Sequence, residues 1–114
     1  MDLTPENKLF WFYVKDNCNH VGVWRVNKKQ FEYTLGHKFD LDSFFEICNS
    51  DKERIVKLSN DKWFIVSFVI FQYGNKFTPK SNVHKSVIKE LELNGIDTSF
   101  LDLSAFEQKT YENE

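Results

Sequence analysis

The sequence predicts a mostly helical α+β fold, and three observations carry this prediction. Hydrophobic residues make up 41% of the 114 positions and aromatic residues 17%, which is enough for a packed core. Glycine and proline are scarce, at four and two residues, so regular elements should be joined by short connections. Segments that suit helices also alternate with shorter segments that suit strands. A chain of this length is expected to form one domain.

The first predicted helix begins at residues 4–6, Thr-Pro-Glu. Threonine can cap a helix, proline suits its first position, and glutamate suits the positive end of its dipole. We expect this helix to run to about Asn19. Its middle, residues 9–14, is apolar on every side, so the helix should be covered on several faces.

A short strand and two helices are expected next. An Asn or Asp precedes each of these helices, where its side chain can cap the helix, and Gly36 can end the first of them. The three elements are a strand over 21–26, a helix over 28–35 after Asn27, and a helix over 41–48 after Asp40.

A β-hairpin follows, because two β-like segments flank the turn-forming residues Ser-Asn-Asp at 59–61. The two strands cover 54–58 and 62–66. Residues 67–73 are apolar, and we favour a short helix there. A second Thr-Pro pair at 78–79 predicts another helix, which ends at residues 94–95, Asn-Gly.

That last helix is predicted to be amphipathic. Lys85 and Lys89 are one turn apart on one face. The opposite, buried stripe is predicted to consist of Val83, Val87, Ile88 and Leu91.

The order helix, strand, helix, helix, hairpin, helix is that of a winged helix-turn-helix. We assign this domain to residues 1–96. Residues 97–114 form an acidic tail with five acids and one base. Within it, Phe100, Leu103 and Phe106 have helical spacing, so the tail is expected to dock as a short helix or to meet a partner.

Three segments, residues 9–27, 62–74 and 83–96, resemble the N-terminal winged-helix domain of phage replication proteins, the replisome-organiser type related in architecture to DnaD. This resemblance implies binding to DNA or to other replication proteins, without catalysis. Members usually carry more sequence before the first helix and continue into a partner-binding region, so this chain is expected to work alone. The matching positions are Asn17, Cys18, Gly22, Trp24, Phe71, Gln72, Tyr73, Gly74, His84, Lys85, Val87 and Ile88.

Several classes of chemistry are disfavoured. The sequence has no P-loop and no glycine-rich dinucleotide turn. Cys18 and His20, joined by Cys48, His37 or His84, fit no paired zinc-ligand spacing. A buried cysteine in an apolar helix is usually inert as a nucleophile. We therefore expect no enzyme, metal, cofactor or small-molecule substrate.

The expected compartment is the cytoplasm of a host bacterial cell. Two cysteines make no disulfide framework, the N-terminus is acidic, and the apolar segment at 9–14 is too short for a signal peptide or a membrane span.

DNA binding is the first functional hypothesis, although the net charge of −2 lacks the usual excess of bases. The third helix would enter the major groove of DNA in this fold, but it is acidic and has no Lys or Arg. Contact is expected instead from the hairpin and the last helix, unless their lysines only keep these faces solvated. The candidate nucleic-acid-binding residues are Arg54, Lys57, Lys62, Lys76, Lys80, His84, Lys85 and Lys89.

Aromatic side chains offer a second mode of contact, because they can stack on bases. Trp11, Trp24, Trp63 and Tyr73 lie in or beside apolar segments, however, so we favour a place in the core.

The leading prediction is therefore a DNA-binding accessory of phage or mobile-element replication. The alternative is a stand-alone phage protein that binds and inhibits a host nucleic-acid-handling machine, in the manner of anti-CRISPR proteins, since acidic surfaces can recognise a basic partner. Its candidate residues are Asp40, Asp42, Glu46, Phe100 and Phe106.

Overall fold

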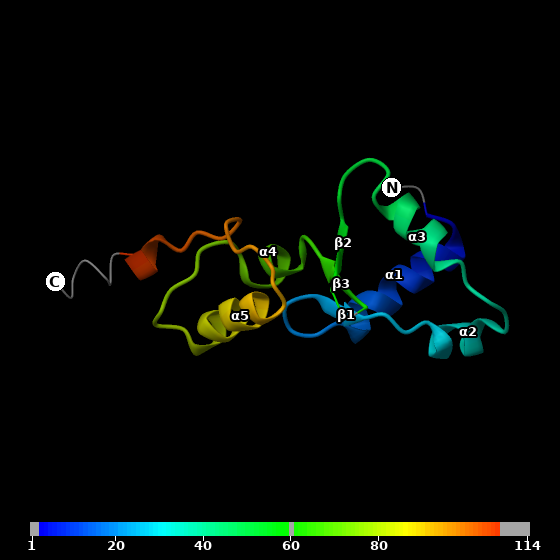
Figure 1. The fold of residues 1–114 in the computed structure, drawn as a ribbon, viewed down its shortest axis with the longest axis horizontal. Coiled ribbons are helices and arrows are strands. Elements are labelled where there is room, and N and C mark those ends of the chain that lie inside the picture. The colour runs from blue at the N-terminus through cyan, green and yellow to red at the C-terminus, as the bar shows by residue number, and fades with distance from the viewer. Residues whose placement is uncertain (1–2, 60, 108–114) are drawn as a thin grey trace. The chain divides into compact units, whose positions relative to one another are not determined.

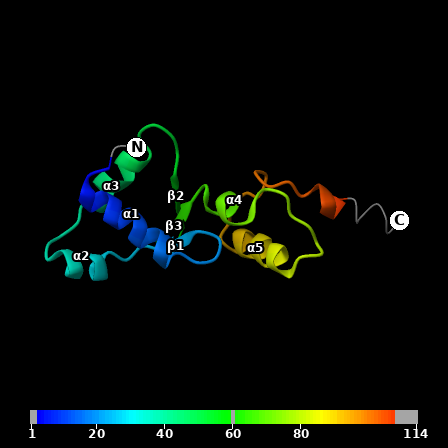
Figure 2. The ribbon, with the colours of Figure 1, turned by 180° about the vertical axis from the view of Figure 1, so that it is seen from behind.

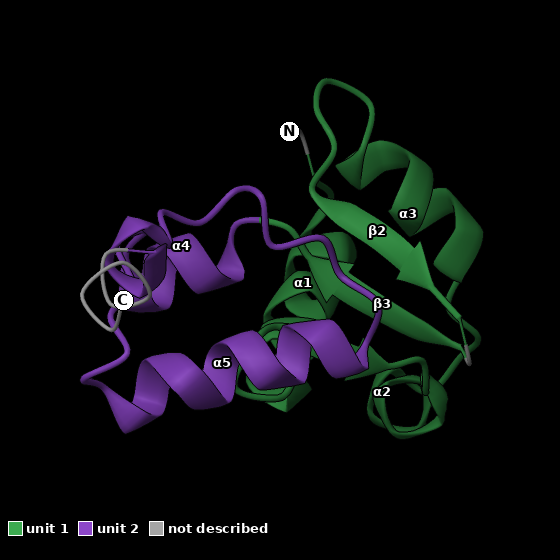
Figure 3. Cartoon of the chain, turned by 60° about the vertical axis from the view of Figure 1, so that its left-hand side comes forward, with its two compact units in different colours: residues 1–66 green, residues 67–114 purple. Residues whose placement is uncertain are grey.

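The computed structural model describes residues 3–59 and 61–107. The chain divides into two compact units, Met1–Val66 (unit 1) and Ser67–Glu114 (unit 2), which Figure 3 distinguishes by colour. The described residues are mostly helical and include a three-stranded antiparallel sheet. The predicted mostly helical α+β class is confirmed. The domain boundary expected after residue 96 stays a prediction.

Unit 1 contains three helices and the sheet, in the predicted order. The strand order is β1-β3-β2, so the last strand of the hairpin is central. Helices α1 and α3 lie on the same side of the strands (Figure 1, Figure 2). The elements are α1 (Pro5–Asn17), β1 (Val23–Arg25), α2 (Lys29–Leu35), α3 (Leu41–Cys48), β2 (Ile55–Leu58) and β3 (Lys62–Ile65).

Two of the predicted helix caps form as expected. The Thr4 hydroxyl accepts a hydrogen bond from the Asn7 N–H at 3.2 Å, at the start of α1. The Asp40 carboxylate accepts one from the Ser43 N–H at 3.0 Å, at the start of α3. Each bond satisfies an N–H that has no partner within its helix.

Helix α1 ends two residues earlier than predicted, because Asn19 serves the following loop. Its side-chain oxygen accepts hydrogen bonds from the N–H groups of Val21 and Val23, both at 3.0 Å. Gly22, between them, has a φ of 88°, which disfavours residues with a side chain. This turn leads directly into β1.

Helix α2 begins one residue later than predicted. The Asn27 side chain accepts a hydrogen bond from the Lys29 N–H at 3.2 Å, and Lys28 occupies the capping position without a side-chain cap. The helix ends at Gly36 in the left-handed conformation, as predicted.

The core of unit 1 is built around the ring of Phe10, which is fully buried. Five other rings lie with their centroids 4.4 to 5.9 Å from it. Beyond them, Trp24 contacts Trp63 at 5.4 Å across the paired strands β1 and β3. The core positions favoured for Trp24 and Trp63 are confirmed, since both are buried. The five rings are those of Tyr13, Trp24, Phe31, Phe39 and Phe44.

The predicted cover of α1 does not extend to one of its faces. Leu9 and Phe12 are 57% and 56% exposed. The rings around Phe10 approach α1 from the other side, and nothing in the sequence distinguishes the two apolar sides. The Lys15 ammonium lies 4.9 Å from the centroid of the Phe12 ring and partly covers it.

Unit 2 contains α4 (Phe68–Tyr73), α5 (Asn82–Leu93) and a helical segment that begins at residue 104. The short helix favoured for 67–73 is confirmed by α4. The segment after α5 returns beside the segment before it. The Phe77 N–H donates to the Asp102 carbonyl at 3.1 Å, and the Asp102 N–H donates to the Asn75 carbonyl at 2.7 Å.

Helix α5 begins later than the Thr-Pro pair predicts. Its cap is Ser81, whose hydroxyl accepts a hydrogen bond from the His84 N–H at 3.1 Å. The hydroxyl of Thr78 accepts from the Lys80 N–H at 3.3 Å and so forms a turn instead. The predicted end is confirmed: Asn94 is the C-cap and Gly95 has a φ of 69°.

Two side chains of unit 2 differ from their predictions: Val83 in its burial and Phe100 in its secondary structure. Val83 is 56% exposed, while Val87 and Leu91 are fully buried and Ile88 is half-buried. Phe100 lies in a turn before the helical segment rather than within a helix, and Leu101 is the buried residue there. Residues 108–114 of the expected tail lie outside the described residues.

Replacing Phe10 tests the core, and Phe12 offers a matched control on the same helix. We expect Phe10→Ala to lower the free energy of unfolding by about 3–5 kcal/mol, because a buried ring leaves a cavity. Phe12→Ala should cost less than about 1 kcal/mol, because that ring is already exposed. Urea unfolding followed by tryptophan fluorescence measures both values. Equal losses for the two variants would contradict the central position of Phe10.

The contact between Glu6 and His37 predicts a pH effect. Both ring nitrogens of His37 face an oxygen, at 2.9 Å from the Lys38 carbonyl and 2.7 Å from the Glu6 carboxylate. The hydrogen bond to the Lys38 carbonyl, followed by the Glu6 charge, raises the pKa of His37 above its ordinary value of 6.5. The contribution to stability is therefore fully present below about pH 6.5 and is lost as the pH rises through the raised pKa.

We expect the thermal midpoint of the wild type to exceed that of His37→Gln by more at pH 6 than at pH 8.5. The difference should be small, because both side chains are about half exposed. The other histidines are present in both proteins, so their effect on the pH dependence of the thermal midpoint cancels in the comparison. A constant difference across this pH range would refute the ion pair.

Candidate nucleic-acid interface

The predicted nucleic-acid-binding residues fall into both units. Arg54, Lys57 and Lys62 belong to unit 1, around the β2–β3 hairpin. The remaining five belong to unit 2, between the end of α4 and the last turns of α5; they are Lys76, Lys80, His84, Lys85 and Lys89.

In unit 1, a pocket of about 210 Å³ lies between the start of α3 and the tip of the hairpin. Two lysines and two aspartates line it, so its charges balance. The ammonium of Lys57 also lies 4.5 Å from the centroid of the Phe45 ring on α3. The pocket therefore has no net positive charge to attract a phosphate. Its lining residues are Val26, Leu41, Asp42, Lys57, Leu58, Asp61, Lys62 and Trp63.

Arg54 is engaged within the protein. Its guanidinium donates two hydrogen bonds to the Asp51 carboxylate and one, at 2.9 Å, to the Cys48 carbonyl. Its side chain is only 18% exposed, and it holds the pKa of the Asp51 carboxyl well below its usual range. Arg54 thus ties the end of α3 to the connection before β2. A phosphate would have to displace these contacts.

The outward face of α3 is acidic. Asp42 and Glu46 are exposed one turn apart, while Phe44 and Cys48 are buried on the opposite side. Asp40 is exposed as well, but one oxygen of its carboxylate caps the helix. This arrangement agrees with the acidic helix read from the sequence, and it places negative charge where a groove-reading helix needs positive charge.

In unit 2, the lysines are exposed. Lys85 and Lys89 lie one turn apart on α5, opposite the buried side chains of Val87 and Leu91. Lys76 and Lys80 are exposed in the segment before α5. All four ammonium groups can therefore reach solvent or a phosphate.

His84 differs from the lysines around it, because its ring is part of the packing. The ring stacks on Phe77 with centroids 4.4 Å apart. Its Nδ1 accepts a hydrogen bond from the Thr78 N–H at 3.1 Å. His84 thus fastens the start of α5 to the preceding loop.

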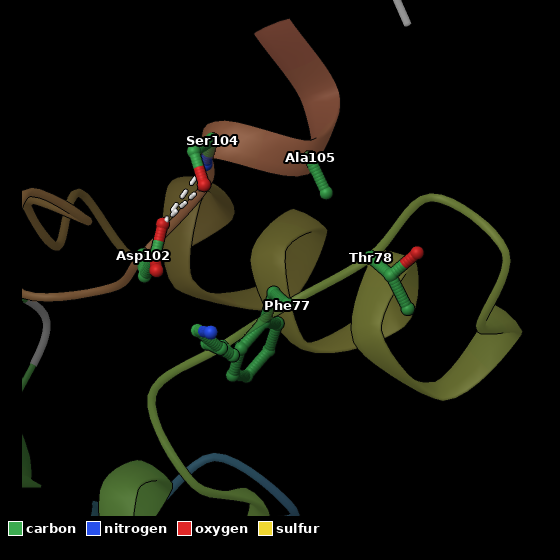
Figure 4. Close-up of a pocket in the computed structure, with 6 residues that line it drawn as sticks. Phe77, Thr78, Asp102, Ser104 and Ala105 are labelled. Atoms are coloured by element: carbon green, nitrogen blue, oxygen red, sulfur yellow. Dashed lines mark hydrogen bonds between the residues drawn. The ribbon is translucent and has the colours of Figure 1, made fainter. Parts of the chain in front are cut away.

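A second pocket, of about 380 Å³, lies in unit 2. Figure 4 shows Asp102 and Ser104 pointing toward each other, joined by dashed lines. The Asp102 carboxylate accepts hydrogen bonds from the Ser104 hydroxyl at 2.7 Å and from the Ser104 N–H at 3.1 Å. These bonds, with the charge of Lys76, lower the pKa of Asp102. The lining residues are Lys76, Phe77, Thr78, Asp102, Ser104 and Ala105.

Neither cysteine has the environment of a nucleophile. Burial raises the pKa of Cys18, and its thiol donates to the Lys15 carbonyl at 3.1 Å. Burial raises the pKa of Cys48 to about 11. Both thiols therefore stay protonated near neutral pH.

Within residues 3–59 and 61–107, no group of three His, Cys, Asp or Glu side chains could hold a metal ion. No helix there is long and apolar enough to cross a membrane.

The aromatic candidates of the alternative hypothesis lie after α5. Phe100 is 38% exposed and Phe106 is half-buried. The sequence reading missed two more exposed rings, Phe71 and Tyr33, each 89% exposed. Phe71 enters the sequence prediction only as a position of the family resemblance. Its exposure depends on how α4 packs, which the sequence pattern does not reveal.

No family model, curated protein or solved structure matches this chain. The likeness to replisome-organiser domains therefore stays a hypothesis.

Proposed function

We propose that unit 1 is a winged helix and that the protein is a DNA-binding, non-enzymatic accessory of phage or mobile-element replication. The order of elements supports the winged helix: α2 and α3 are followed by the β2–β3 hairpin, and β1 pairs with β3. In this arrangement α3 is the second helix of the pair and the hairpin is the wing. The expected place of action is the cytoplasm of the host cell.

The exposed pair Lys85 and Lys89 on α5 is the observation that carries DNA binding. Residues 75–89 contain these lysines with Lys76 and Lys80, and no Asp or Glu. Lysines one turn apart can approach neighbouring phosphates, whereas α3 would bring Asp42 and Glu46 toward them. We infer that α5 makes the main backbone contact and that α3 stays outside the groove.

The wing contributes less to DNA binding than α5 does. Lys57 and Lys62 can reach phosphates, but Asp42 and Asp61 line the same pocket and offset their charge. Arg54 stabilises the connection between α3 and β2 and is not expected to contact DNA. Contacts to phosphates position a protein without reading sequence, so binding should tolerate changes of base pair.

Reversing two charges on α5 tests this proposal. We expect Lys85→Glu/Lys89→Glu to weaken binding to duplex DNA at low salt. The loss of two phosphate contacts should also make the negative slope of log affinity against log salt less steep, by about 1.8. Fluorescence anisotropy with a labelled duplex, repeated over a series of salt concentrations, measures both effects.

Lys29→Glu/Lys38→Glu is the matched control. Both lysines are exposed in unit 1, and the double reversal changes the net charge by the same amount. The control should retain most of the wild-type slope. Equal slopes for the α5 variant and the wild type, or no duplex binding by the wild type at low salt, would rule out the proposed interface.

A second candidate function is supported by the acidic face of α3. Asp42 and Glu46 are exposed one turn apart, with Asp40 at the helix start, and this face suits a basic protein surface. In this alternative the protein binds and inhibits a nucleic-acid-handling machine of the host. Phe100 and Phe106 of unit 2 are further candidates for apolar contact with a partner.

Charge reversal on α3 tests the alternative. We expect Asp42→Lys/Glu46→Lys to abolish capture of a protein partner from nuclease-treated host lysate, because the surface then repels a basic partner. Asp16→Lys/Glu53→Lys changes two other exposed acids of unit 1 and should leave capture intact. Capture that survives the α3 reversal would exclude this role for α3.

A further inference from the structure

Phe71 presents an unusual apolar surface for a small domain. It is 89% exposed, the highest value among the described phenylalanines. Its neighbours in α4, Ile70 and Gln72, are exposed too, and the exposure continues from Gly74 to Lys76. The fold leaves this ring open to solvent, where a ligand can reach it.

The charges around Phe71 indicate the class of partner. Residues 62–89 contain no Asp or Glu, and the part within unit 2 carries four exposed lysines. Other exposed rings differ in this respect. Phe12 already has the Lys15 ammonium 4.9 Å from its ring centroid, and Tyr33 directly follows Glu32. Phe71 is thus an open ring in an acid-free, cationic segment, which suits an anionic ligand with flat apolar groups.

A chain of aromatic contacts connects the end of α4 to the start of α5. Tyr73, at the end of α4, contacts Phe77 with ring centroids 6.5 Å apart, and Phe77 stacks on His84 in α5. The Thr78 N–H bonds to the same histidine ring. Figures 1 and 3 show α4 beside α5. Ring and lysines therefore belong to one compact unit.

We propose that unit 2 binds DNA that contains unpaired bases next to a duplex, with a base stacked on Phe71 and phosphates held by the lysines. This inference rests on the proposed function and specifies its substrate. Stacking needs only the flat face of a base and therefore tolerates any sequence. The exposed Gln72 amide, beside the ring in the chain, can both donate to and accept from a base edge.

Two DNA probes test the inference: a blunt duplex, and the same duplex with a single-stranded oligothymidine extension. We expect the wild type to bind the extended duplex more tightly. Phe71→Ala should reduce affinity for it by about 5- to 150-fold, the range for loss of one stacked base. Affinity for the blunt duplex should stay unchanged.

Tyr33→Ala is the matched control, because this ring is equally exposed but lies in unit 1. It should bind both probes like the wild type. Phe71→Trp should keep the preference, and the extension should quench the fluorescence of the introduced indole. Both Phe71 variants are expected to fold, since the ring is exposed, and their thermal midpoints check this.

The outcomes separate this inference from the proposed function. If Phe71→Ala keeps the wild-type ratio of the two affinities, the stacking proposal is overturned while duplex binding through α5 stands; Phe71 would then suit a protein partner. If the wild type binds neither probe, the proposed function fails and this inference with it. Loss of the preference in Tyr33→Ala would also overturn a specific role for Phe71.

Discussion

Phe10 lies on α1, and its ring contacts aromatic side chains from nearly every other part of unit 1. Trp24 comes from β1, Phe31 from α2, and Phe44 from α3, with centroids 4.8 to 5.7 Å from Phe10. Phe39 approaches most closely, at 4.4 Å, from the connection before α3. The Phe10 ring thereby determines how the helices and the sheet pack, because each neighbouring element must fit against its buried surface.

This core also determines which charges face solvent. Since Phe44 and Cys48 point inward, the helical repeat directs Asp42 and Glu46 outward. The acidic face of α3 is thus a consequence of packing, and its negative charge disfavours contact with DNA phosphates. The exposed lysines of residues 75–89, a segment without Asp or Glu, lie instead in unit 2. There Val87 and Leu91 turn inward and place Lys85 and Lys89 on the open side of α5.

The sequence predicted elements where a cap and a packing face agree. Helix α3 has its predicted bounds because Asp40 caps it and Phe44 and Cys48 give it a buried side. The predicted start of α5 was wrong, because a Thr-Pro pair suits a turn as well as a helix. Ser81 provides the cap instead.

The candidate site was only partly accessible from the sequence. Charge placement on α3 and α5 follows from helical spacing, so these faces could be anticipated. The contacts of Arg54 and His84 and the exposure of Phe71 depend on tertiary packing. A basic residue in a loop has the same sequence pattern whether it is exposed or bonded within the protein. An aromatic residue in an apolar segment has the same pattern whether it is buried or exposed.

We propose that DNA contacts α5 and not α3. An NMR titration of the ¹⁵N-labelled full chain with a short duplex measures this most directly, since each amide reports on its own surroundings. We expect the largest shifts at Lys85, Lys89 and their neighbours in α5, with the amides of Leu41–Cys48 nearly unchanged. Shifts concentrated in α3 with α5 unaffected would contradict the account.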